Sequence, residues 1–174
     1  EAPEPGVNMG DGQTLARFLR WVREAAPRQR YALIIMGHGA SVGGHAAALG
    51  VGLTRSGLAW DASSGGDALS AAELREAVAS AGGERWLDAL FLDCCFGGSL
   101  EVGYELKRCA WWLCAAPGEM SSPGVPWAEV LTTAGRSGAV DGEQLVRVCL
   151  ETAARQAAGR LELVGLNLAR MSEV

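Results

Sequence analysis

The chain has 174 residues, a length that fits one compact domain with a single hydrophobic core. Hydrophobic residues make up 49% and charged residues 20%, which is typical of a globular protein and not of a disordered one. A net charge of -5 with scattered basic residues excludes a nucleic-acid surface, and no apolar run could cross a bilayer. We therefore expect a soluble protein with no nucleic-acid and no membrane partner.

The first half of the chain predicts two helices and one buried strand, separated by a long loop. Asp11 can cap a helix over 13–26, and the continuous apolar run YALIIMG predicts a strand over 31–37. Residues 40–67 are rich in Gly and Ser, which predicts an active-site or processing loop. Ser70 and Glu73 then form the capping-box signature of a helix over 71–82.

The second half continues the alternation of strands and helices. The run LDALFLD predicts a buried strand that ends at Cys94 and Cys95, and Gly97 and Gly98 let the chain turn into a further helix. The remaining expected elements are helices over 99–108, 127–133 and 142–158 and strands over 109–115 and 161–167. This order predicts an α/β fold, a three-layer α-β-α sandwich with a mainly parallel sheet.

The cysteines indicate the cellular compartment of the protein, and the first residue indicates whether the chain has been processed. There are five cysteines, an odd number without CxxC spacing, which predicts mostly buried, reduced thiols and favours the cytoplasm. One or two disulfides and a secreted location stay open. Because the chain starts with Glu1 rather than Met and shows no signal peptide, we expect a fragment or a processed chain.

Reactive side chains follow two of the predicted strands. His38 comes just after the first buried strand, and Cys94 and Cys95 come just after the second. Ligands in open α/β sheets bind beyond the carboxyl ends of the strands, and neighbouring strands lie about 4.8 Å apart. An imidazole beside a thiol favours the thiolate and can return a proton to the leaving amine. The N–H groups of Gly39 and Cys95 are then candidate donors to an oxyanion.

Each of these residues also has a structural interpretation. An isolated Cys at a strand end is more often a small core residue than a nucleophile. We assign His45 no role, and Asp61 and Asp67 are expected to be turn and cap residues rather than metal ligands. The sequence contains no zinc-site spacing, so we expect no metal site.

Several segments together resemble the clostripain-like peptidases, family C11 of the caspase-like clan. They are NMGDGQTLARFLRWV, YALIIMGHGA, GLAWDASSGGDALSAAELREAV and LFLDCCFGGSLEVGYELKRCAWWLCAAPGEMSSPGVPW, which cover most of the chain. The resemblance implies a caspase-like fold, a cysteine endopeptidase, His38 as catalytic base and Cys95 as nucleophile. Cys94 stands where the family usually has a small residue.

The resemblance also implies further features of the site. Asp93 matches an acidic residue of a pocket for Arg or Lys side chains, and Glu119 could replace an Asp that some members place in the following loop. Self-cleavage is known in the family, and Arg55 followed by Ser56 is a candidate site, although an exposed Arg explains the same residues. Some relatives depend on calcium, and no other cofactor is implied.

Family members normally have more chain on both sides of the segment matched here. We therefore expect residues 1–174 to be one peptidase core whose sheet is completed by a second chain or a flanking segment. Two other functions stay open beside a peptidase acting on protein or peptide substrates. One is a catalytically silent or partner-regulated binding module in a larger assembly, and the other is a thiol-dependent hydrolase of non-peptide substrates.

Overall fold

The computed structural model describes residues 6–39, 57–138, 141–156 and 161–172. Its helices are α1 (Gly12–Ala25), α2 (Ala71–Gly82), α3 (Leu100–Glu105), α4 (Trp127–Ser137) and α5 (Gly142–Gln156), with short 3-10 helices η2 (Ala62–Ser64) and η3 (Leu168–Ser172). Its strands are β1 (Ala32–Met36), β2 (Ala59–Asp61), β3 (Asp67–Leu69), β4 (Leu87–Asp93), β5 (Ala110–Ala115) and β6 (Val164–Asn167). No helix in these ranges combines the length and apolar character that crossing a bilayer requires.

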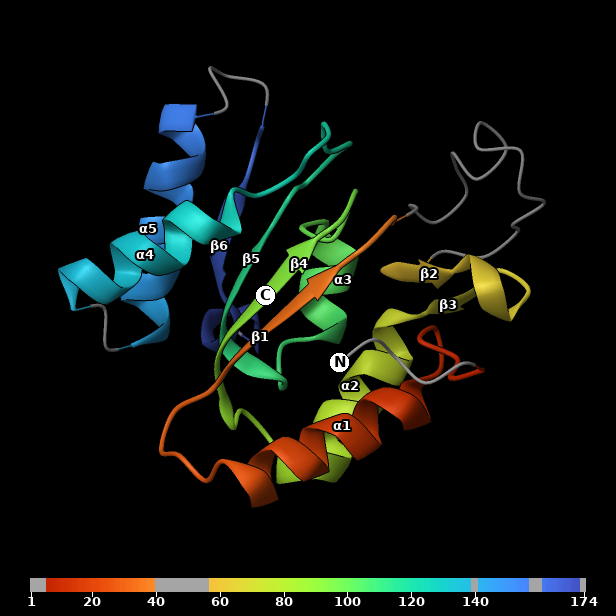
Figure 1. Ribbon diagram of the computed structural model, residues 1–174. Helices are drawn as coiled ribbons and strands as arrows, with labels where there is room; N and C mark the ends of the chain where they lie inside the picture. Colours follow the sequence, from red (N-terminus) through yellow and green to blue (C-terminus); the bar gives the residue numbers. More distant parts are fainter. Residues whose placement is uncertain (1–5, 40–56, 139–140, 157–160, 173–174) are drawn as a thin grey trace.

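A four-stranded sheet with the order β1-β4-β5-β6 forms the centre of the fold (Figure 1). The strands β1, β4 and β5 are parallel, and β6 joins β5 in the antiparallel direction. The predicted mainly parallel sheet is therefore confirmed. Strand β4 has neighbours on both sides and is almost completely buried, which explains why its sequence is a continuous apolar run.

Helices cover both faces of the sheet, so the predicted three-layer sandwich is also confirmed. On one face, α1, α2 and α3 pack in a core that includes Leu19, Leu74, Val78 and Leu106. On the other face, α4 and α5 pack in a second core that includes Val130. This arrangement leaves the two ends of the sheet uncovered by these helices, and the loops at those ends are free to form sites.

The predicted loop over 40–67 contains a small antiparallel hairpin in the part that the structure describes. Strands β2 and β3 pair with each other and not with the main sheet. Between them, Asp61 caps η2 and accepts a hydrogen bond from the Met9 backbone N–H at 2.9 Å. The hydrogen bond from the Ser63 side chain is the main cause that lowers the pKa of Asp61. The Asn8 side chain also donates to Asp67 at 2.6 Å, so the hairpin holds the segment that precedes α1.

Strand β1 lies at the border of the sheet. It pairs with β4 along one side, and within the described ranges no strand pairs with its other side. The Met36 side chain at the end of β1 is 60% exposed. An open edge of this kind is a place where another strand can pair.

Candidate active site

A cleft of about 250 Å³ opens where β1 and β4 end. Its walls come from three segments: the end of β1, the end of β4 and the loop after β5. The residues that line it are Met36, Gly37, His38, Asp93, Cys94, Cys95, Met120, Ser121, Ser122, Pro123 and Gly124. Both predicted reactive residues, His38 and Cys95, therefore lie in one cleft at the carboxyl ends of parallel strands.

The register of the sheet explains why these two residues meet. Met36 pairs with Asp93, so His38 and Cys95 each lie two residues beyond the last pair of their strands. The Gly37 N–H donates to the Asp93 carbonyl at 3.2 Å, which continues the pairing by one step. Gly39 then packs so closely against the Cys95 carbonyl that there is no room for a Cβ atom. The two loops leave the sheet side by side.

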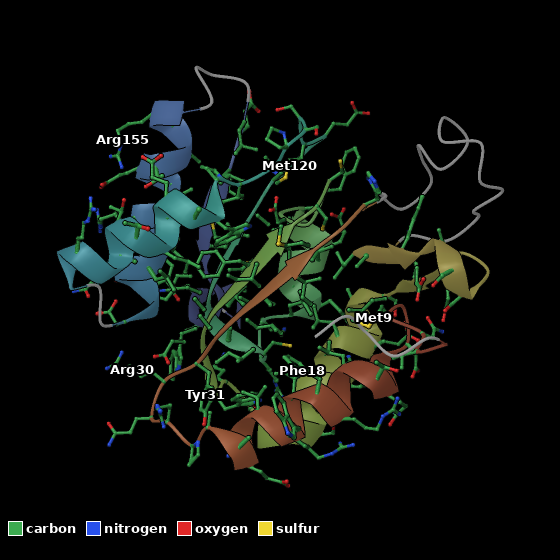
Figure 2. The ribbon with its side chains drawn as sticks, viewed as in Figure 1. Met9, Phe18, Arg30, Tyr31, Met120 and Arg155 are labelled. Atoms are coloured by element: carbon green, nitrogen blue, oxygen red, sulfur yellow. The ribbon has the colours of Figure 1, made fainter. Side chains whose placement is uncertain are left out.

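The two adjacent cysteines have different environments. Cys94 is 2% exposed, and this burial raises its pKa to about 12, so it remains a thiol at neutral pH. Cys95 is only partly buried and borders the cleft. The Met120 N–H donates to the Cys95 Sγ at 3.2 Å, and the same sulfur lies 3.9 Å from the Met120 carbonyl oxygen. Figure 2 places Met120 at the opposite end of the sheet from Arg30 and Tyr31.

The turn that follows Cys95 has an unusual backbone. Phe96 has φ = 60°, in the left-handed region that non-glycine residues seldom occupy. The turn is fixed by hydrogen bonds from the Phe96 N–H to the Gly118 carbonyl and from the Gly98 N–H to the Ala116 carbonyl, both at 2.8 Å. Strained backbone that is held in place by neighbouring structure is often found at functional sites.

The helix after this turn is shorter than predicted. The sequence predicts a helix over 99–108, but α3 spans Leu100–Glu105 only. The chain must turn into β5 at Ala110, and it does so through a bond from the Cys109 N–H to the Leu106 carbonyl. Because α3 is short and begins five residues after Cys95, its dipole contributes little at the sulfur.

Asp93 forms the floor of the cleft. The residue is 6% exposed, and its carboxylate accepts hydrogen bonds from the Val125 N–H at 3.2 Å and from the Trp127 indole N–H at 2.7 Å. Gly124, with φ = 83°, lies directly against the carboxylate. The Trp127 ring in turn meets the Phe91 ring edge to face, with centroids 5.3 Å apart. The position of Asp93 is thus fixed by the loop after β5 and by the start of α4.

Sequence reasoning did not find Met120, Val125 or Trp127 as neighbours of the site. They lie 25 to 34 residues beyond the groups that they contact. The only local signal is that their loop follows a buried strand, as the loops of His38 and Cys95 do.

The other predicted site residues lie elsewhere. Glu119 is exposed and is not among the residues that line the cleft, although Met120 beside it is. Arg55, Ser56 and His45 lie outside the described residues. Asp61 caps η2, as predicted, whereas Asp67 is the first residue of β3 and accepts a hydrogen bond from the Asn8 side chain. The part of the chain that the structure describes contains no group of three acidic, His or Cys side chains suited to a metal ion, and calcium dependence stays a prediction.

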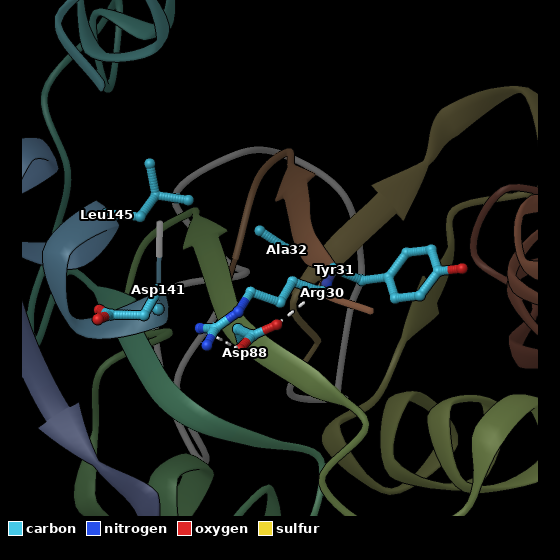
Figure 3. A pocket seen from close by; sticks show the side chains of 7 residues that line it. Arg30, Tyr31, Ala32, Asp88, Asp141 and Leu145 are labelled. Atoms are coloured by element: carbon cyan, nitrogen blue, oxygen red, sulfur yellow. Dashed lines mark hydrogen bonds and ion pairs between the residues drawn. The ribbon is translucent and has the colours of Figure 1, made fainter. Parts of the chain in front are cut away.

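A second cleft, of about 190 Å³, lies at the opposite end of the sheet (Figure 3). It is lined by residues before β1, in β4 and at the start of α5, and Arg30 and Asp88 form an ion pair there at 3.3 Å. The Tyr31 N–H also donates to Asp88 at 3.1 Å. These bonds connect the segment before β1 to β4, so the polar groups of this cleft have a structural role.

Comparison with known proteins identifies the family of the chain and proteins with a similar fold. The chain matches the model of the clostripain family, Peptidase C11, over residues 2–174. No curated protein matches it significantly in sequence. The structure resembles a secreted C11 cysteine protease from Bacteroides thetaiotaomicron, solved in complex with an irreversible peptide inhibitor, with a TM-score of 0.74 and 17% identity. It also resembles an inactive zymogen C11 protease from Parabacteroides distasonis, with a TM-score of 0.70 and 15% identity.

These alignments include nearly all of this chain but only part of its relatives. They cover 96% and 99% of this chain, and 48% and 44% of the Bacteroides and Parabacteroides proteins. The chain thus spans about half the length of the solved structures that it matches. The agreement of fold, together with a family match that runs over almost every residue, establishes that the chain belongs to the clostripain family of peptidases.

Proposed function

We propose that this chain carries the catalytic centre of a cysteine endopeptidase, with Cys95 as nucleophile and His38 as general base. The observation that supports this most is the shared cleft, which brings one imidazole and one accessible thiol together at the ends of β1 and β4. The neighbouring Cys94 is buried and remains a protonated thiol, which favours Cys95 over Cys94 as the nucleophile.

The reaction follows from the chemistry of these two groups. His38 takes the proton of Cys95, and the sulfur attacks the carbonyl carbon of the scissile peptide bond. The N–H groups of Gly39 and Cys95 donate to the oxygen that becomes negatively charged. As the C–N bond breaks, His38 gives the proton to the leaving amine. Water then hydrolyses the thioester, with His38 as base, and the free thiol is restored.

We further propose that the site prefers Arg or Lys before the cleaved bond, with Asp93 as the residue that binds the basic side chain. Asp93 lines the cleft and accepts bonds from two neutral donors, Val125 and Trp127. These bonds do not neutralise the charge, and a carboxylate has about four acceptor positions, so it can also accept from a cation. Glu119, one residue before the cleft segment 120–124, is the candidate for a second acidic contact.

Proteolytic activation and completion of the sheet belong to the same proposal. The Parabacteroides relative is described as an inactive zymogen, and a cut after Arg55 would fall in the segment between β1 and β2. The side of β1 on which no described strand pairs offers an edge to a flanking segment or a second chain. The Bacteroides relative is described as secreted, so the prediction of a cytoplasmic location gains no support from these matches.

Two variants at adjacent positions test the assignment of the nucleophile. Cys95→Ala is expected to abolish cleavage of fluorogenic peptides with Arg or Lys before the scissile bond, whereas Cys94→Ala is expected to retain it. Cleavage by the Cys95→Ala protein at the normal rate would refute the proposal. Digestion of a peptide mixture, followed by mass spectrometry, then reports whether the cuts follow basic residues.

The principal alternative is a binding module that keeps the fold without the activity, which the position of Glu119 outside the residues that line the cleft favours. An irreversible thiol-reactive inhibitor with an Arg side chain separates the two functions. An adduct on Cys95 supports the peptidase. Folded protein that forms no adduct and cleaves no peptide supports the binding module. A hydrolase of other substrates would form the adduct but turn over thioesters or amides that are not peptides.

A further inference from the structure

Two cysteines outside the cleft face each other inside the protein. Cys114 lies on β5 and Cys149 lies on α5, and their side chains are 2% and 0% exposed. Their Sγ atoms are 3.9 Å apart, with the Cys114 thiol directed at the Cys149 sulfur. Both belong to the core between the sheet and the α4–α5 layer. Neither takes part in the reaction proposed above.

We propose that Cys114 and Cys149 form an intramolecular disulfide when the chain folds in an oxidising compartment. A disulfide bond is about 2.05 Å long, so the two sulfur atoms have to approach by about 2 Å. Two side chains that already point at each other can share this movement by rotating about their Cα–Cβ bonds. The bond would join β5 and α5, which already pack against each other in the core.

The chemistry requires an electron acceptor, and a small-molecule disulfide such as oxidised glutathione supplies it. The thiolate of one cysteine attacks the acceptor's disulfide and releases one glutathione thiolate. The second cysteine then attacks the mixed disulfide, which forms the Cys114–Cys149 bond and releases the second glutathione. The protein loses two protons and two electrons, and oxidised glutathione becomes two reduced molecules.

The environment of the pair determines when this reaction can take place. A hydrogen bond with Cys149 and burial both raise the pKa of Cys114 far above that of an exposed thiol. The attacking thiolate is therefore almost absent in the folded protein, and the core also keeps the oxidant out. The bond must form while α5 is still unpacked from β5. In a reducing compartment the same two residues remain thiols and fill the core as small apolar side chains.

The bridge lies next to the floor of the cleft without touching the reactive groups. Cys114 pairs with Phe91 in the register of β5 and β4, and the Phe91 ring contacts Trp127, which donates to Asp93. Fastening α5 to β5 at this point stabilises the layer that holds Asp93. It leaves His38 and Cys95 unchanged, so we expect it to raise stability and not to alter the chemistry of cleavage.

The test is to refold the full chain from denaturant, once with a mixture of reduced and oxidised glutathione and once with reductant. Peptide mapping without reduction identifies the linked cysteines, and chymotrypsin separates Cys109 from Cys114 because it cuts after Trp111 and Trp112. The expected result is a Cys114–Cys149 link in the oxidised sample. Its melting temperature should be about 5 to 10 °C above that of the reduced sample.

Two variants make the result independent of folding defects, because each is compared with itself in oxidised and reduced form. Cys149→Ala should lose both the link and the rise in melting temperature. Cys109→Ala, a buried cysteine in the other core, should keep both. Absence of the link in refolded protein, or an equal rise in melting temperature for Cys149→Ala, would overturn the proposal. So would rapid formation of the link when oxidised glutathione is added to folded, reduced protein.

Discussion

The close contact between the two loops of the cleft makes Gly39→Ala a sensitive test of the site. The new methyl group would overlap the Cys95 carbonyl oxygen and come within 3.2 Å of the Cys94 Sγ. Both neighbours belong to a turn fixed by hydrogen bonds to the loop after β5, so the loop that carries His38 has to move. Restoring ordinary contact requires a shift of about 1 Å, and a misplacement of this size costs about 100-fold in rate.

The measurement is kcat/KM on a peptide amide with Arg before the scissile bond, together with the melting temperature. We expect Gly39→Ala to lower kcat/KM about 100-fold and to destabilise the fold by only about 1 to 3 kcal/mol. Gly118→Ala is the matched control, because a Cβ at residue 118, in the loop after β5, would meet nothing within 4 Å. Its activity should stay within about twofold of the unchanged protein. If Gly39→Ala kept full activity, the contact between the loops would not position the imidazole.

Three further results are expected. Asp93→Asn removes the charge of the side chain but keeps its shape. It should lower kcat/KM for Arg substrates about 30-fold or more, as loss of a buried charge pair does, and lower kcat/KM less for substrates with neutral side chains. Equal losses for both kinds of substrate would contradict the role of Asp93. Ser70→Ala removes the observed capping box of α2 and should lower the free energy of unfolding by about 1 kcal/mol in urea titrations, without changing cleavage. Burial raises the pKa of Cys94 and of Cys109 to about 12, against 9.0 for an exposed thiol. The unfolded chain therefore loses these two protons at a lower pH than the folded chain does, and the free energy of unfolding should fall as the pH rises from about 9 towards 12. Cys109→Ala should make this fall shallower in thermal melts.

The elements that the sequence predicts best are those whose determinants are local. Strand β4 begins and ends at the predicted residues, because an apolar run that is buried on both faces needs no partner to be recognised. Helix α2 likewise matches the prediction of 71–82, since Ser70 and Glu73 form their capping box within one turn. The hairpin of β2 and β3 was missed because its strands have three residues each, too few for a periodic pattern.

In the site, too, features with local determinants could be predicted from the sequence, and the others could not. The positions of His38 and Cys95 could be predicted, because both follow strands that are visible in the sequence and parallel strands end at one edge of the sheet. The contacts of Met120 with Cys95 and of Trp127 with Asp93 could not, because they depend on how an irregular loop folds back over the sheet. Backbone features such as the positive φ of Phe96 have no signal in residue type.

The order of the strands gives the two reactive residues unequal mechanical support. Strand β4, which leads to Cys95, pairs with a strand on each side, whereas β1, which leads to His38, has a described neighbour on one side only. A polypeptide that docks on or leaves that side of β1 would shift His38 while Cys95 stays where it is. Control of the proposed peptidase from outside would then act on proton transfer, and the Cys95 thiol would keep its position in both the resting and the active state.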